Sequence, residues 1–135
     1  MNTNYKIITD HNLLVQKYKG EFCFDDLFEH IKNVTKDPNW SKVEKIITDL
    51  RNIDLEVFYK NMDYFLKYRN NNVMKSYFNV FLVNTPLSTA LVHLYKEQLN
   101  SNKYKYEYCS TVEYAITFLG LQDQFEEIKS IMEKL

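Results

Sequence analysis

Apolar and polar residues alternate along the chain with two different periods, and each period predicts one type of secondary structure. Five short segments are rich in Val, Ile, Tyr and Phe or alternate at every second residue, which is typical of β-strands. The predicted strands cover residues 5–9, 13–18, 43–50, 77–83 and 104–109. The turn-forming sequence Asp10-His11-Asn12 separates the first two strands, so we expect them to form a hairpin.

Between and after the strands, apolar residues recur at three- and four-residue spacing, which is the period of an amphipathic helix. The helical segments cover residues 24–36, 55–72, 86–99, 112–119 and 125–135. Thr85 suits the N-cap of the third helix, and Pro86 suits its first position. Ser110 begins an S-x-x-E capping box before the fourth helix, and Gly120 stands where that helix is expected to end.

The predicted elements follow the order ββαβαβαβα with one more helix at the end, which predicts an α/β fold. Helical connections make successive strands parallel through right-handed crossovers, and the opening hairpin adds one antiparallel pair. We therefore expect a single mixed, mainly parallel five-stranded sheet covered by helices, plus an extra C-terminal helix. The 135 residues fit one domain, in which residues 122–135 form an amphipathic helix packed on residues 1–121.

Charge and cysteine content exclude several function classes. The net charge is −1, without the basic excess of proteins that bind nucleic acid. Cys23 and Cys109 have no metal-binding spacing, which indicates free thiols in a reducing compartment. Residues 1–4 are polar and no signal-peptide segment follows, and no apolar run is long enough to span a membrane. We therefore expect a cytoplasmic protein without a transmembrane segment.

Polar residues that follow the central strands form the first candidate site, because ligands of such sheets bind beyond the carboxyl ends of the strands. The candidates for a ligand or partner surface are Asp49, Arg51, Asn52, Asn84, Thr85, Ser88 and Ser110. Asp49 and Arg51 point to the same face of a strand and fit either a site pair or a structural salt bridge. Free N–H groups after Thr85 could hold an anion, but the corner lacks the glycines of a phosphate loop, which favours a simple helix start.

Catalytic and metal-binding motifs are missing from the sequence. It contains no G-x-G-x-x-G, no P-loop and no G-x-S-x-G pattern. His93 and Glu97 lie four residues apart on a helix, but no further metal ligand accompanies them, and His30 is expected on a helix surface. The sequence therefore predicts a protein that is not an enzyme and that uses neither a metal nor a cofactor.

Aromatic residues make up 16% of the chain and crowd the second and third predicted helices. The excess could line an apolar pocket, form a partner interface, or build a bulky core with tyrosines at its rim. Phe58, Tyr59, Phe65 and Tyr95 are the candidates for an apolar pocket.

Several segments together resemble the SpoIIAA-like branch of the STAS-like (sulfate transporter and anti-sigma factor antagonist) domains. The segments are FDDLFEHI, DPNW, KIITDLRNIDL, FLVNTPLSTALVHLY and YCSTVEYAITFLG, which lie between residues 24 and 120. The resemblance implies a mixed sheet with helices, no catalysis, and a role in protein–protein switching or small-ligand binding. Anti-sigma antagonists carry a phosphorylatable Ser or Thr after the third strand, and residues 51–55 contain neither, which argues against a phosphorylation switch there.

Two functional hypotheses follow from the residues and the resemblance. The first is a bacterial, non-enzymatic regulatory domain that acts through a protein partner or as a homodimer. The alternative is the binding or sensing of a small apolar ligand or lipid, with peripheral membrane association as one form of it.

Overall fold

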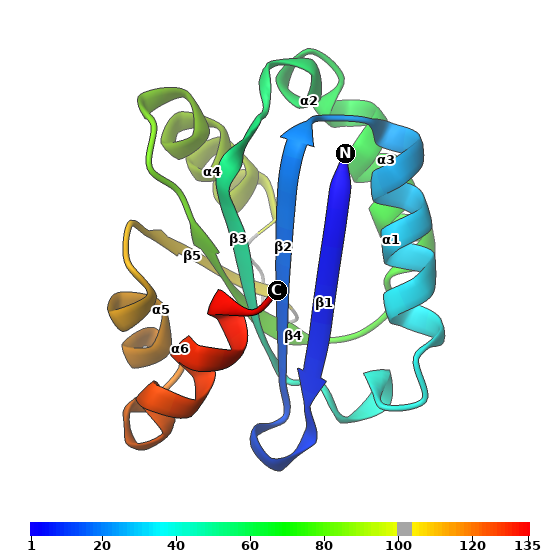
Figure 1. Ribbon diagram of the computed structural model, residues 1–135. Helices are drawn as coiled ribbons and strands as arrows, with labels where there is room; N and C mark the ends of the chain where they lie inside the picture. Colours follow the sequence, from blue (N-terminus) through cyan, green and yellow to red (C-terminus); the bar gives the residue numbers. More distant parts are fainter. Residues whose placement is uncertain (100–103) are drawn as a thin grey trace.

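The computed structural model of the protein describes residues 1–99 and 104–135 and contains one five-stranded sheet (Figure 1). The strands are β1 (Asn2–Ile8), β2 (Leu13–Glu21), β3 (Lys45–Asp54), β4 (Tyr77–Leu82) and β5 (Tyr104–Cys109). They lie in sequential order across the sheet; β1 and β2 pair antiparallel, and all other neighbours pair parallel. The predicted mixed, mainly parallel α/β fold is confirmed.

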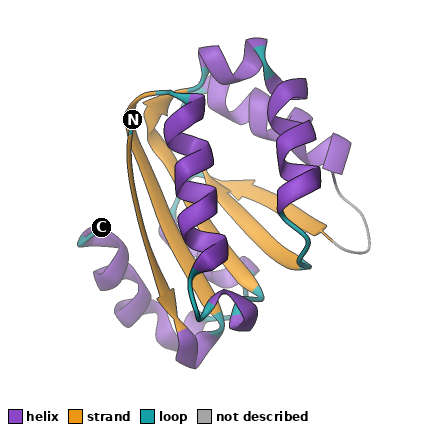
Figure 2. Ribbon diagram, turned by 90° about the vertical axis from the view of Figure 1, so that its right-hand side faces the viewer, coloured by secondary structure: helices purple, strands orange, loops and turns teal. Residues whose placement is uncertain are grey.

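Helices cover both faces of the sheet. They are α1 (Phe24–Lys36), α2 (Glu56–Lys60), α3 (Met62–Asn72), α4 (Pro86–Leu99), α5 (Val112–Phe118) and α6 (Phe125–Glu133), with short 3₁₀ turns at Thr9–His11, Trp40–Lys42 and Gln122–Gln124. Right-handed crossovers between sequential parallel neighbours place α1 to α4 on one face, which we call the front layer. Figure 2 shows α1 in front of the sheet and the C-terminal helix on its far side.

The layer behind the sheet consists of α5 and α6, which pack an apolar core against it. Ile47 and Val80, on neighbouring central strands, have no solvent-exposed surface and pack with Ile116 and Ile128 of the two helices. Strands that are buried on both faces read as nearly continuous apolar runs, which explains the sequence of residues 77–83. The predicted C-terminal helix therefore contributes Ile128 and Met132 to the core between the sheet and this layer.

Several predicted boundaries differ from the structure: β1 begins at Asn2 and not at residue 5, and β3 begins at Lys45 and not at residue 43. At the ends of β2 and β3, strand pairing outweighs local turn signals. β3 continues beyond Leu50 to Asp54, and β2 continues through Gly20, which has a φ of +91°. The partners Gly20↔Ile53 and Glu21↔Asp54 extend the ladder past a register shift between the pairs Lys17↔Asp49 and Lys19↔Asn52. The single helix expected over residues 55–72 is two helices, α2 and α3, that break at Asn61, where φ is −131° and ψ is 27°.

Thr111, and not the predicted Ser110, is the N-cap of α5. Its Oγ1 accepts a hydrogen bond from the Tyr114 backbone N–H at 3.3 Å. We expect Thr111→Ala to lower the free energy of unfolding by about 1 kcal/mol, because one helix N–H then loses its partner. Ser110→Ala is the matched control and should change it by less than about 0.5 kcal/mol. Urea denaturation measures both, and a larger loss for Ser110→Ala would contradict this assignment.

Candidate functional site

A cavity of about 140 Å³ lies between the sheet and helices α1 to α4 of the front layer. Apolar side chains from both layers form most of its lining; they include Leu14, Ile46 and Phe81 of the sheet and Leu27, Phe65 and Val92 of the helices. An apolar protein cavity of about 150 Å³ is large enough to hold benzene. The cavity therefore has the size of a single small organic molecule.

A chain of buried polar side chains crosses the cavity wall from α1 to β4. The His30 Nε2–H group donates to Gln16 Oε1 at 2.8 Å, and Gln16 Nε2 donates to Thr48 Oγ1 at 2.8 Å. The Thr48 hydroxyl in turn donates to Asn79 Oδ1 at 3.0 Å. All four side chains are buried and line the cavity. Gln16 and Thr48 are direct partners in the β2–β3 ladder, so the sheet fixes the spacing of the chain.

His30 begins this chain as a neutral imidazole. The rings of Tyr5 and Tyr18 pack edge-on against it, with centroids 5.7 and 5.1 Å away. Burial lowers its pKa from 6.5 to about 4. Since Nε2 carries the proton that Gln16 accepts, Nδ1 is left as a hydrogen-bond acceptor. The expectation that His30 lies on a helix surface is wrong, because its side chain is only 3% exposed.

A buried arginine, Arg69 of α3, occupies another part of the cavity lining. Its Nη2 donates to the hydroxyls of Tyr77 and Tyr106, each at 2.5 Å, and Nη1 donates to Asn70 Oδ1 at 3.2 Å. The guanidinium carbon lies 4.2 Å from the ring centroid of Tyr104, a cation–π contact. Burial by itself would lower the pKa of Arg69, but the surrounding tyrosines raise it above its ordinary value, so the group stays charged.

Three of the four aromatic residues predicted for an apolar pocket line this cavity. They are Phe58, Phe65 and Tyr95. Tyr59 does not line it and is 53% exposed. Phe58 and Tyr59 are consecutive on α2, and consecutive helical residues point about 100° apart, so only one of them faces the core.

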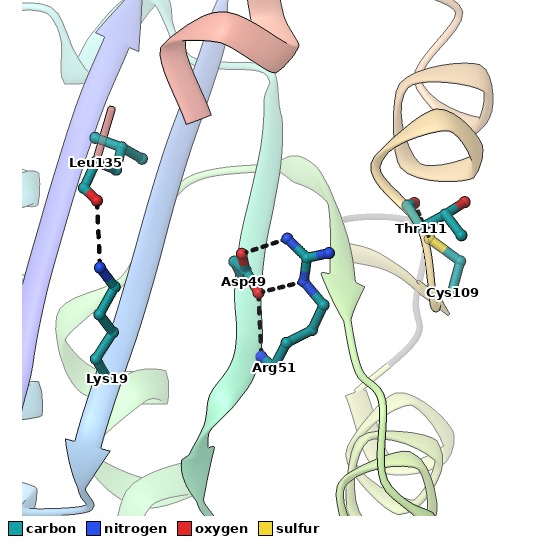
Figure 3. Close-up of polar contacts among 6 residues, drawn as sticks. All are labelled: Lys19, Asp49, Arg51, Cys109, Thr111 and Leu135. Carbon is teal, nitrogen blue, oxygen red and sulfur yellow. Dashed lines mark hydrogen bonds and ion pairs between the residues drawn. The ribbon is translucent and has the colours of Figure 1, made fainter. Parts of the chain in front are cut away.

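The predicted pair of Asp49 and Arg51 lies within β3 (Figure 3). Neither residue lines the cavity. Arg51 Nε and Nη2 donate to the two oxygens of Asp49 at 3.0 and 2.9 Å, and the Arg51 backbone N–H donates to Oδ1 at 3.1 Å. Burial works to raise the pKa of Asp49, but these bonds hold it below its ordinary value. Asp49 and Arg51 therefore bond to each other, as in a structural salt bridge. Asn52 is an exposed residue of the same strand.

The other predicted polar residues divide between a helix cap and a surface groove. Thr85 Oγ1 accepts from the Ser88 backbone N–H at 3.1 Å and donates to Ser88 Oγ at 2.9 Å, so Thr85 is the expected N-cap and Ser88 is buried behind it. Asn84, Thr85 and Ser110 line a shallow groove together with His93 and Tyr108. Asp49 and Arg51 do not line that groove, so the strand ends do not form one site.

Within residues 1–99 and 104–135, no three His, Cys, Asp or Glu side chains lie close enough to hold a metal ion together. Among the same residues, no helix is both long enough and apolar enough to cross a bilayer. Comparisons of the chain with protein-family models, with curated proteins and with solved structures found no match. The resemblance to STAS-like domains therefore stays a prediction from its sequence segments.

The polar residues of the cavity were not among the sequence candidates, and only those on the strands give a faint signal. Gln16, Thr48 and Asn79 each interrupt an apolar strand segment at a position that faces the front layer. Arg69 lies among exposed polar residues near the end of α3, where nothing in the local pattern distinguishes it from a solvated arginine.

Proposed function

We propose that the protein binds a small, largely apolar molecule in the cavity between the sheet and the front layer, as a carrier or sensor and not as an enzyme. The observation that carries this proposal is the cavity of about 140 Å³ with its mostly apolar lining. Protein interiors are close-packed, and voids larger than a water molecule are few in a domain. An empty cavity of this size costs stability, and a bound molecule would offset that cost by filling it.

The polar chain provides the few fixed polar groups that orient a ligand in an otherwise apolar site. Its two ends, His30 Nδ1 and Asn79 Nδ2, form no hydrogen bond with any other described residue. One end is an acceptor and the other is a donor. A ligand with one polar group and an apolar body therefore finds a complementary surface.

Titration with benzyl alcohol and with 1-hexanol tests this proposal directly. Both probes have a small apolar body and one hydroxyl group. We expect each to shift the NMR methyl resonances of Leu14 and Val92, which line the cavity, and to raise the unfolding temperature as its concentration increases. The proposal is wrong if neither the alcohols nor the carboxylic acids with the same apolar bodies move these resonances.

Two variants on α4 locate the binding site. Val92→Phe adds bulk inside the cavity and should weaken the binding of both alcohols at least about tenfold, since it fills the space that they occupy. Leu94→Phe is the matched control, because Leu94 is 43% exposed and lines the surface groove instead. Equal affinity in the wild type and in a folded Val92→Phe variant would place the binding site elsewhere.

A second candidate function is contact with a protein partner or with a second copy of the chain. Val57, Tyr59 and Tyr64 are exposed large apolar side chains on the adjoining helices α2 and α3. Large exposed apolar side chains on adjoining helices are candidates for an interaction surface. Native mass spectrometry tests the homodimer: a dimeric mass supports it, and a monomeric mass contradicts it.

A further inference from the structure

We infer that the molecule bound in this cavity is a small monocarboxylic acid whose carboxylate pairs with Arg69. This inference rests on the proposed function, because it names the chemical class of the ligand. It is carried by a buried positive charge that has no negative partner in the part of the chain that the structure describes.

Arg69 is one of only two arginines in the chain, and its side chain is 2% exposed. No Asp or Glu among the described residues forms an ion pair with it. Its Nε–H group is buried and has no hydrogen-bond acceptor among those residues. Arg51, the other arginine, shows the usual arrangement, with its Nε and Nη2 both bonded to a carboxylate.

The groups around Arg69 stabilise its charge without neutralising it. Tyr95 and Tyr106 are neutral phenols, because burial raises the pKa of both above the ordinary value. The cation–π contact with Tyr104 and the bonds to Tyr77 and Tyr106 are attractive, but they add no negative charge. A guanidinium does not lose its proton in proteins, so the buried charge persists.

An anionic ligand would supply the negative partner that the buried charge of Arg69 lacks among the described residues. Burying a charge costs much free energy unless the charge is paired and hydrogen-bonded. One positive charge and one unused Nε–H group match the single charge of a carboxylate better than the multiple charge of a phosphate ester. The cavity of about 140 Å³ leaves room for a benzene-sized or short aliphatic body. Aromatic monocarboxylic acids and short-chain fatty acids combine one carboxylate with an apolar body of this size.

Binding of benzoate and hexanoate, compared with benzyl alcohol and 1-hexanol, tests the inference on the wild-type protein. Each acid and its alcohol have the same apolar body, so the comparison isolates the charged group. We expect the acids to bind at least about tenfold more tightly at pH 7, since a hydrogen bond to a charged group is stronger than one between neutral groups. Alcohols that bind as tightly as the acids would overturn the inference and leave the proposed function intact. If neither acids nor alcohols bind, the proposed function itself fails.

NMR of ¹⁵N-labelled arginine side chains tests separately whether the ligand contacts Arg69. With two arginines in the chain, two Nε–H resonances are expected, and that of Arg51 is an internal reference. Benzoate should move the Arg69 resonance and benzyl alcohol should leave it nearly unchanged. A resonance that does not respond to bound benzoate would show that Arg69 only supports the fold.

Arg69→Met and Lys67→Met complete the test. Arg69→Met removes the charge and keeps the aliphatic stem, so the preference for acids over alcohols should disappear. Lys67 is an exposed residue of the same helix, and its replacement makes the same change in net charge. Lys67→Met should therefore keep the preference. If Arg69→Met does not fold, the acid–alcohol comparison and the Nε–H resonance of the wild type still decide the inference.

Discussion

Thr48→Val is expected to lower the free energy of unfolding by about 3 kcal/mol. The Thr48 hydroxyl is the middle of the polar chain: it accepts from Gln16 and donates to Asn79. Valine has nearly the same shape but no hydroxyl, so two buried polar groups lose a partner at once. Each buried group left unsatisfied costs about 1–3 kcal/mol. Urea denaturation of the wild type and the variant measures the difference.

Thr48→Ser is the control that separates the hydrogen bonds from the packing. Serine keeps the hydroxyl and removes one buried methyl group, which should cost only about 1 kcal/mol. The expected order of stability is therefore wild type, then Thr48→Ser, then Thr48→Val. A serine variant that is less stable than the valine variant would mean that packing at Thr48 outweighs its hydrogen bonds.

Most of the fold could be predicted because its helices and strands depend on strong local patterns. The range Pro86–Leu99 has a capping threonine, a proline at the first position and regular apolar spacing, and the structure places α4 over those residues. The range Tyr104–Cys109 was likewise predicted to the residue. The end of β3 could not be predicted, because the polar residues after Leu50 stay in the strand only through their pairing with β2.

The candidate site was harder to predict because it depends on contacts between distant segments. Phe58 and Phe65 were found through the aromatic excess on one helix, which is a local signal. The polar chain joins residues of α1, β2, β3 and β4, and each of them alone resembles an isolated polar position. The importance of Arg69 depends on the absence of a carboxylate around it in the described residues, and no sequence pattern records such an absence.

Stability is expected to fall by about 3 kcal/mol as the pH is lowered from 6.5 to 4, because His30 is buried as a neutral imidazole. Its pKa is about 4 in the folded protein and 6.5 as an ordinary value. Below pH 6.5 the unfolded chain binds a proton that the folded protein does not, so protonation favours unfolding until the pH reaches about 4. Each unit of pKa difference corresponds to about 1.4 kcal/mol. Well above pH 6.5 His30 binds no proton in either state, so it no longer makes stability depend on pH.

His30→Gln isolates this contribution. The glutamine amide has an N–H group for Gln16 but does not titrate, so the loss between pH 6.5 and 4 should largely disappear in the variant. His93→Gln is the matched control, since that side chain is half exposed and His30 stays in place. Folding lowers the pKa of Asp49 below its ordinary value of 3.8, so the stability from its ion pair begins to fall at about pH 4; that loss is common to the wild type and to His30→Gln and cancels in their comparison. Urea denaturation at several pH values measures the difference, and an unchanged pH dependence in His30→Gln would show that His30 is not the titrating group.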